Sequence, residues 1–294
     1  MLAITNCSQI VTLAGPSRPR AGAEMRNLAI ITDGALLAEN GLITAVGPRE
    51  QIEPLIRTHE VVDAGGRILL PGFIDAHTHP IFGGNRANEF EMRAQGFTYQ
   101  EIAAAGGGIQ SSVRATRAAT EEELFVAARK RASWFLQNGT TTIEAKSGYG
   151  LSFEDELKML RVIRRMGEET ALTCKATFLG AHSFPKDVPR DSYIESLIHE
   201  MLPTAASLRL AEYCDIFCEQ NYYTHDEARR ILGKAKALGL KLRMHVDQLT
   251  DNGGAALAAE LGAITADHLE QTGPEGIAKL KAAGTMPVLL PASV

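Results

Sequence analysis

From residue 67 onward, short apolar segments alternate with amphipathic helical segments, and this alternation constrains the fold more than any other feature. The helical segments carry their own start signals. Thr120–Glu123 and Thr224–Glu227 are capping boxes, and Ser152 precedes a third helical segment. Each of these helices is followed by an apolar segment of strand composition. Strands that alternate with helices in this way form a parallel sheet, so the sequence predicts an α/β fold.

Seven segments after residue 66 have strand character, and polar residues cluster where each one ends: RILLPGFIDAHTH, TTTIEAKSG, ALTCKATFLG, CDIFCE, KLRMHVDQ, AITADHLE and MPVLLPAS. A doubly wound sheet could use seven strands, whereas a (β/α)8 barrel needs eight. The polar strand ends favour the barrel, because barrel active sites are built at that position.

The first 66 residues differ from the rest of the chain in composition and hydrophobic pattern. Their short β-like segments are broken by Gly, Pro and Asn-Gly turn residues. Asn40–Gly41, between two apolar segments, is a hairpin signal. We therefore expect a small β domain over residues 1–66 and an α/β domain over residues 67–294.

Composition excludes several functional classes. The 294 residues include 30 Lys+Arg and 35 Asp+Glu, for a net charge of −5, which offers no basic surface for nucleic acid. No run of about 18 apolar residues indicates a membrane span, and the N-terminus lacks the basic region of a secretory signal. Four cysteines are too few for a disulfide scaffold. We expect a cytoplasmic protein with no nucleic-acid or membrane partner.

Four histidines stand at the ends of three strand segments. His77 and His79 are two positions apart, so their side chains lie on the same side of a strand. A His-x-His pair alone is as often two surface histidines as it is part of a metal site. Here the run RILLPGFID places the pair at the end of a buried strand, which favours the metal site. His245 and His268 each end another apolar segment. A lone buried histidine is usually a core residue, whereas four in matching positions predict a metal centre.

The predicted chemistry is metal-assisted hydrolysis. Imidazoles with one or two carboxylates suit zinc or iron, and such an ion lowers the pKa of a bound water toward ~7. His182 is a candidate for substrate binding or for stabilising developing charge, with a turn-capping histidine as the alternative. Arg86, on a Gly-rich loop, suits a substrate carboxylate, unless it is simply solvated. Tyr149, between two glycines, is expected to point into the pocket, and Tyr99 is a weaker candidate.

Several other features carry no functional prediction. Gly106–Gly108 lack the Lys-Ser/Thr of a phosphate-binding loop, and we interpret them as flexible backbone. Lys146 has the position of a carbamylated lysine of dinuclear hydrolases, but a solvated lysine at a strand end is the expectation. His59, His199 and His225 are expected to face solvent.

The segment PGFIDAHTH resembles the signature of the amidohydrolase superfamily. A narrower resemblance, to the imidazolonepropionase family, extends over nearly the whole chain and rests on FGGNRANEFEMR, AGGGIQSSVRATR, TTTIEAKSGYGL, FLGAHSFP and MHVDQL with NGGAALAAELGAITADHLE. It implies a metal-bearing (β/α)8 TIM barrel, a small β-sandwich formed from both chain ends and a cytoplasmic homodimer. The implied reaction is hydrolysis of 4-imidazolone-5-propanoate to N-formimino-L-glutamate in histidine degradation. In it, a metal-activated water attacks the cyclic amide carbonyl.

The resemblance makes His77, His79 and His245 ligands of one zinc or iron ion. The family's last metal ligand is an Asp at the end of the eighth strand, before an Asn-Pro-Gly-type loop. The chain stops at Pro291–Val294, inside the seventh strand segment. We therefore expect a truncated reading of a longer enzyme, in which the last strand of the barrel is missing. For the 294-residue polypeptide itself this predicts poor solubility and no activity.

The resemblance also assigns the substrate contacts. Arg86, Tyr149 and His182 hold the substrate, the first two at its propionate. Gln248 matches a substrate-contacting position that is Glu in some relatives. Because glutamine cannot act as a general base, we hypothesise that His268 is the base and that His182 polarises the ring carbonyl.

Two alternatives to this function remain. One is another amidohydrolase, such as an aminohydrolase of a purine or pyrimidine ring, which would not need Arg86 and Tyr149 placed for an aliphatic carboxylate. The other is a non-catalytic scaffold on the same barrel. Such relatives tend to lose metal histidines, whereas all the candidates are present here.

Overall fold

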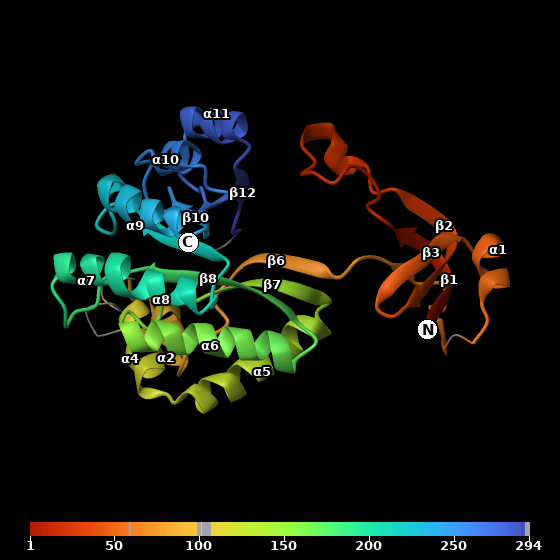
Figure 1. The fold of residues 1–294 in the computed structure, drawn as a ribbon, viewed down its shortest axis with the longest axis horizontal. Helices are drawn as coiled ribbons and strands as arrows, with labels where there is room; N and C mark the ends of the chain where they lie inside the picture. The colour runs from red at the N-terminus through yellow and green to blue at the C-terminus, as the bar shows by residue number, and fades with distance from the viewer. Residues whose placement is uncertain (59, 99–100, 102–106, 292–294) are drawn as a thin grey trace. The chain divides into compact units, whose positions relative to one another are not determined.

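The computed structural model describes residues 1–58, 60–98, 101 and 107–291, which fall into two compact units, Met1–Gly72 and Phe73–Val294 (Figure 1). His59, Tyr99 and Gly106 lie outside the described residues, so the expectations for them are not tested here.

The N-terminal unit is a five-stranded sheet in the order β3-β2-β1-β4, with β5 paired to β1. Its strands and short helices are β1 (Leu2–Val11), η1 (Gly22–Arg26), β2 (Ile30–Glu39), β3 (Leu42–Pro48), α1 (Arg49–Ile52), η2 (Glu53–Leu55), β4 (Glu60–Asp63) and β5 (Ile68–Leu69). The expected hairpin is confirmed, because β2 and β3 pair antiparallel around Asn40–Gly41. Both turn residues have positive φ, 51° and 78°, the backbone conformation that favours Asn-Gly.

The sheet of this unit buries side chains on both faces. Leu36 and Leu37, adjacent on β2, belong to two separate apolar clusters. Since neighbouring residues of a strand point to opposite faces, each cluster lies on its own side of the sheet.

The sequence segment RILLPGFIDAHTH was expected to form one strand, and this expectation is wrong. Ile68–Leu69 pairs with Gln9–Ile10 of β1 and so belongs to the N-terminal sheet. The next strand begins at Phe73, after Pro71 and Gly72. Proline cannot donate a hydrogen bond to a sheet, which explains why the strand is interrupted there.

The second unit contains a seven-stranded parallel sheet in the order β12-β11-β10-β9-β8-β7-β6. Its strands are β6 (Phe73–Thr78), β7 (Thr140–Lys146), β8 (Thr173–Ala181), β9 (Tyr213–Cys218), β10 (Lys241–Val246), β11 (Thr265–His268) and β12 (Met286–Val288). All seven expected segments contribute a strand. Spatial order follows sequence order without reversal, which is the order of a (β/α)8 barrel and not of a doubly wound sheet.

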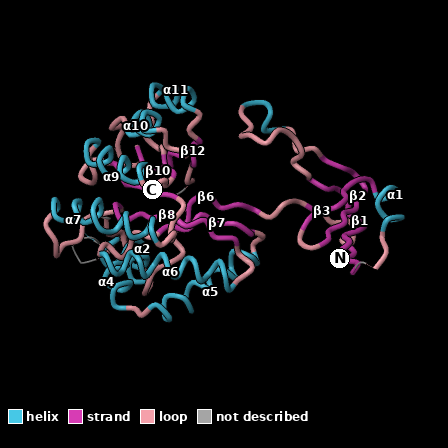
Figure 2. Tube along the Cα trace, in the orientation of Figure 1, coloured by secondary structure: helices cyan, strands magenta, loops and turns pink. Residues whose placement is uncertain are grey.

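Helices follow the strands of this sheet and pack against it (Figure 2). They are α2 (Ala87–Ala94), α4 (Ile109–Ala118), α5 (Glu121–Gln137), α6 (Phe153–Glu169), α7 (Arg190–Ser196), the π-helical turn η3 (Leu197–Met201), α8 (Leu202–Ser207), α9 (His225–Ala237), α10 (Gly254–Leu261) and α11 (Pro274–Ala283). Both expected capping boxes are present, at Thr120 and Thr224, and Ser152 caps α6. Among the described helices, none is long and apolar enough to cross a bilayer.

The core of the second unit lies between the sheet and these helices, and it is continuous from α4 to α11. One expectation about it is wrong: β6 is not buried along its whole length. Phe73 is 57% exposed and Ile74 is 72% exposed. Among the described strands, β6 pairs only with β7, so its first residues lie at an open edge of the sheet.

Candidate active site

Three histidines from two strands of the barrel meet at one point. His77 on β6, His79 just after it and His245 on β10 each offer a ligand atom within 4.8 Å of the others. The rings of His77 and His245 have centroids 4.6 Å apart. Their strands are four places apart in the sheet, which in a flat sheet would separate them by about 19 Å. The curvature of the barrel therefore creates the cluster.

The nitrogens of this cluster have the properties of metal ligands. His79 Nδ1 and His245 Nε2 are buried and have no hydrogen-bond partner in the structure. Burial lowers the pKa of both imidazoles well below its ordinary value, so the rings are neutral and keep their lone pairs. Neutral imidazole nitrogens are common ligands of zinc and iron. The three histidines can therefore hold a divalent metal ion.

His268 lies beside the cluster, at the end of β11. Its ring centroid is 5.3 Å from that of His77 and 5.2 Å from that of His245. Its Nδ1 is 3.4 Å from an oxygen of Glu270, and burial lowers its pKa. His268 and the following Leu269 have φ of 80° and 70°, a left-handed conformation that non-glycine residues adopt at a cost of about 1–3 kcal/mol each. Strained backbone of this kind concentrates at functional sites.

His182, at the end of β8, packs on the other side of the cluster. Its ring stacks on His79, with centroids 5.0 Å apart and an interplanar angle of 16°. Its Nδ1 lies 3.0 Å from the carbonyl oxygen of Gly148. Burial lowers its pKa to about 4, so the ring is neutral near pH 7.

Tyr149 packs beside the rings of His79 and His182. Its ring centroid lies 5.5 Å from that of His79 and 5.4 Å from that of His182. Burial raises the pKa of its phenol. Two buried or partly buried side chains, Glu156 and Arg117, hydrogen-bond to the backbone of the loop that carries Tyr149. Glu156 accepts three backbone N–H hydrogen bonds from the loop, and Arg117 donates to two of its carbonyls.

Arg86 and Gln248 are placed less tightly than the histidines. Arg86 is exposed at the start of α2, and its Nε donates to the hydroxyl of Ser112 on α4. The positive charge of Arg86 lowers the pKa of Tyr149, although burial raises that pKa by a larger amount. The Arg86 guanidinium therefore acts electrostatically on Tyr149. Gln248 is half-buried just after β10, three residues beyond His245.

Beneath the histidines lies a cluster of buried charges that the sequence interpretation missed. Lys146, expected to be solvated, has no exposed side-chain surface. Its Nζ lies 2.7 Å from Asp215, 2.9 Å from Glu144 and 3.5 Å from Asp267. Burial alone would lower the pKa of Lys146, but these carboxylates raise it above its ordinary value. The lysine points into the barrel because its partners are there, and the expectation of solvation is wrong.

The buried charges contact the histidines directly. His77 Nδ1 lies 2.7 Å from Asp267 Oδ2, and His245 Nδ1 lies 3.0 Å from Asp215 Oδ2. Arg243, two residues before His245, donates to Asp267 at 2.9 Å. A sequence signal for this cluster exists, because charged residues stand next to apolar residues inside strand segments, as in TTTIEAK and KLRMHV. Charged side chains are almost never fully buried in such positions unless they are paired.

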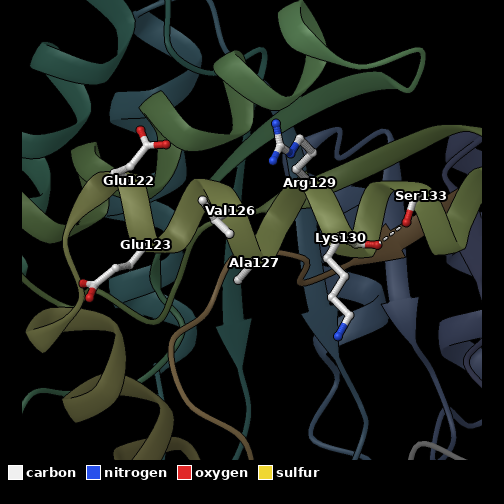
Figure 3. A pocket seen from close by; sticks show the side chains of 7 residues that line it. All are labelled: Glu122, Glu123, Val126, Ala127, Arg129, Lys130 and Ser133. Atoms are coloured by element: carbon white, nitrogen blue, oxygen red, sulfur yellow. Dashed lines mark hydrogen bonds between the residues drawn. The ribbon is translucent and has the colours of Figure 1, made fainter.

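The remaining features lie away from this site. His199 is exposed, as expected, whereas His225 is half-buried at the start of α9. A surface hollow lies along one exposed face of α5 (Figure 3), and it is lined by Glu122, Glu123, Val126, Ala127, Arg129, Lys130 and Ser133. Figure 3 shows the Ser133 hydroxyl bound to the Lys130 carbonyl of the same helix. None of the candidate site residues lines this hollow.

A parallel barrel with a histidine triad at the ends of its strands is typical of hydrolases of the amidohydrolase class. Residues 60–118 match the profile of the Amidohydrolase family. Solved structures with the same fold include a 5-methylcytosine deaminase from Klebsiella pneumoniae (TM-score 0.65, 16% identity, 97% of this chain and 65% of that chain). A guanine deaminase from C. acetobutylicum is also similar (TM-score 0.62, 11% identity, 99% and 68%).

Curated relatives narrow the assignment. The chain is 58% identical to an imidazolonepropionase of Solibacter usitatus, over 99% of this chain and 71% of that protein. It is 50% identical to an imidazolonepropionase of Symbiobacterium thermophilum, over 99% of this chain and 69% of that protein. The chain belongs to the imidazolonepropionase family.

Proposed function

We propose that the protein hydrolyses 4-imidazolone-5-propanoate to N-formimino-L-glutamate, a step of histidine degradation. The observation that carries this proposal is that Tyr149 lies beside the three-histidine cluster and that the charge of Arg86 acts on Tyr149. A metal-assisted hydrolase needs the histidine cluster to hold its metal ion. Recognition of an aliphatic carboxylate needs hydrogen-bond donors such as Arg86 and Tyr149. The names of the curated relatives agree with this reaction.

We assign His77, His79 and His245 as the ligands of one metal ion, zinc or iron. The support is their convergence within 4.8 Å and the two buried ring nitrogens that have no hydrogen-bond partner. When bound, such an ion supplies Lewis-acid activation of water and of the substrate carbonyl. The identity of the metal is tested by element analysis of the purified protein.

We assign His268 as the general base. Its Nδ1 faces Glu270, so the proton of the neutral ring belongs on Nδ1 and the lone pair on Nε2. Its lowered pKa keeps that lone pair available near pH 7. The ring is beside His77 and His245, where a water activated for attack would lie. His268 would take the proton of this water and return it to the leaving ring nitrogen.

His182 is assigned to substrate binding. Its Nδ1–H donates to the Gly148 carbonyl, which leaves Nε2 as an acceptor. Polarising the ring carbonyl would require a second proton on this ring, and its pKa of about 4 makes that form scarce near pH 7. The geometry therefore favours His182 as an acceptor for a ring N–H of the substrate.

Arg86 and Tyr149 are assigned to the propionate of the substrate. The guanidinium can donate two parallel hydrogen bonds to a carboxylate. The raised pKa of Tyr149 keeps its hydroxyl protonated and able to donate a third. Gln248, half-buried after β10, is assigned a further substrate contact through its amide.

The experiment that tests this function is an assay of the protein expressed from its complete reading frame. With 4-imidazolone-5-propanoate we expect one water to be added, the ring to open, and N-formimino-L-glutamate to form without ammonia. An aminohydrolase would instead release ammonia from a purine or pyrimidine, as the name of the solved 5-methylcytosine deaminase suggests for that protein. Ammonia release from cytosine or guanine, with no turnover of the imidazolone, would refute the proposal. No turnover of either, with no bound metal, would favour a non-catalytic scaffold.

We further propose the setting in which the protein works. The division into a small β domain over residues 1–66 and a hydrolase barrel over residues 67–294 stays a proposal, supported by the two compact units Met1–Gly72 and Phe73–Val294. All four cysteines are unpaired in the structure, which fits a reducing cytoplasm. A homodimer with no nucleic-acid or membrane partner is proposed from the family. The mass in solution, measured by light scattering after gel filtration, tests the dimer.

A further inference from the structure

Two of the three histidines that form the metal cluster touch a buried carboxylate, and one buried lysine lies against both carboxylates. We propose that Asp267, Asp215 and Lys146 are positioning residues that hold His77 and His245 in the tautomer with the proton on Nδ1 and the metal-binding lone pair on Nε2. This inference rests on the metal-binding part of the proposed function and not on the identity of the substrate.

The first half of this arrangement is the pair His77 and Asp267. Asp267 has no exposed side-chain surface, and its Oδ2 lies 2.7 Å from His77 Nδ1. The same oxygen accepts a hydrogen bond of 2.9 Å from Arg243, whose side chain also donates to the Ala76 carbonyl. A carboxylate only accepts hydrogen bonds, so the imidazole must donate through Nδ1. Its Nε2 is then the nitrogen that carries the lone pair.

The second half is the pair His245 and Asp215. Asp215 Oδ2 lies 3.0 Å from His245 Nδ1 and 2.7 Å from Lys146 Nζ. The contact with His245 is not aligned as a hydrogen bond in the structure. The charge of Asp215 nonetheless decides the tautomer of His245. A lone pair on Nδ1 would be repelled by the buried carboxylate, whereas a proton on Nδ1 is attracted to it. His245 Nε2, buried without a partner, then keeps its lone pair for the metal.

Lys146 connects the two halves. Its Nζ lies 2.7 Å from Asp215 and 3.5 Å from Asp267, and Glu144 is its third neighbour at 2.9 Å. Through these contacts Lys146 fixes the position of both carboxylates, and its positive charge stabilises the two negative charges that face the histidines. The cluster contains three carboxylates and two cations, Lys146 and Arg243, so one negative charge remains under the site. That charge complements a divalent cation at the histidines.

The first test is made on the unaltered protein, expressed from its complete reading frame and freed of metal with a chelator. Nitrogen-15 NMR of histidine-labelled protein distinguishes the two tautomers, and single His→Gln variants assign the signals. We expect the Nδ1–H tautomer for His77 and His245 near pH 7. The Nε2–H tautomer, or an even mixture, at either residue would overturn the inference.

The second test measures affinity for zinc by competition with a chelator, without any substrate. We expect Asp267→Asn and Asp215→Asn each to weaken zinc binding by about 10–100-fold, the usual effect of losing a carboxylate behind a ligand histidine. The matched control is Asp187→Asn, which removes an equally short contact, 2.9 Å to Arg117, from an exposed aspartate. We expect its affinity to be unchanged.

The outcomes of these tests separate the inference from the proposed function. Unchanged zinc affinity in folded Asp267→Asn and Asp215→Asn variants would refute the positioning role. If a variant fails to fold, the tautomers of the unaltered protein still decide. Failure of the protein to hydrolyse 4-imidazolone-5-propanoate would refute the substrate assignment and leave both measurements standing. Absence of both zinc and iron binding by the unaltered protein would overturn both the positioning role and the metal-dependent function.

Discussion

Asp267 lies 2.7 Å from His77 across the barrel interior, although the two residues are 190 positions apart in the chain. The contact joins the first and the sixth strand of the parallel sheet, β6 and β11. It therefore depends on the curvature of the whole sheet between them. The metal cluster and the buried charges below it form one unit, in which the position of each histidine ring is set by a residue of a distant strand.

The metal assignment predicts the effect of removing one ligand. In His245→Ala we expect the bound metal to fall from about one equivalent to near zero. The variant keeps only two of the three histidines, and zinc-type sites usually need at least three protein ligands. Element analysis of purified protein measures this, with circular dichroism to check the fold. His199→Ala removes an exposed histidine and should retain the metal. Full metal content in folded His245→Ala would show that the cluster is not the metal site.

The assignment of His268 as general base predicts a loss of turnover without a loss of metal. In His268→Ala we expect kcat to fall by about 10²–10⁴-fold, the usual contribution of a positioned base. The metal content should stay normal, because His268 is not among the three grouped ligands. Near-normal kcat with intact metal would show that another group accepts the proton.

The sequence allowed much of the barrel to be predicted. Each of its seven strand segments contributes a strand, since alternation of apolar and amphipathic segments depends only on local pattern. The division between RILL and FIDAHT was not predictable from that pattern. It follows from the pairing of Ile68 with Gln9 in another sheet, which is a contact between distant parts of the chain.

The site shows the same limit. The positions of His77, His79 and His245 could be read from strand ends, because parallel strands of a barrel end on the same side. Lys146 was misread, because a lysine in a strand is usually solvated unless it has partners. Two of those partners, Asp215 and Asp267, come from strands 69 or more residues away. A charged residue inside a strand segment signals that partners exist, but the local sequence does not identify these two.

The assignment of Arg86 predicts a selective loss of affinity for the carboxylate. In Arg86→Ala we expect KM for 4-imidazolone-5-propanoate to rise about 10–100-fold, which corresponds to a charged hydrogen bond of roughly 1.5–3 kcal/mol. For the analogue with a carboxamide in place of the carboxylate, the variant and the unaltered protein should have similar KM. An equal loss for both compounds would indicate a structural role, through the hydrogen bond to Ser112.

The burial of Lys146 predicts a large effect on stability. Lys146→Met leaves three buried carboxylates with Arg243 as their remaining neighbouring cation, and we expect unfolding to become easier by about 3–5 kcal/mol. Urea unfolding of the metal-free protein measures this. Lys175→Met makes the same chemical change in an exposed pair with Glu212 and should shift stability by less than about 1 kcal/mol. Equal effects of the two substitutions would contradict the role of the buried cluster.

The lowered pKa of His182 predicts that the metal-free protein loses stability in mild acid. Its folded-state pKa of about 4 lies below the ordinary histidine pKa of 6.5, so the native protein binds fewer protons than the unfolded chain between these values. Its contribution is fully present above about pH 6.5 and is lost as pH falls toward 4. Between about pH 7 and pH 5 this amounts to about 2 kcal/mol for His182 alone. The buried His79 and His245 add a change of the same sign.

Urea unfolding at the two pH values, with chelator present, tests this pH dependence. His182→Gln removes one titrating group, so its loss of stability between pH 7 and pH 5 should be about 2 kcal/mol smaller than that of the unaltered protein. His199→Gln removes an exposed histidine and should keep the full loss. If His182→Gln and the unaltered protein lose the same stability, then His182 titrates in the native state as it does in the unfolded chain. The neutral acceptor role assigned to its Nε2 would then have to be abandoned.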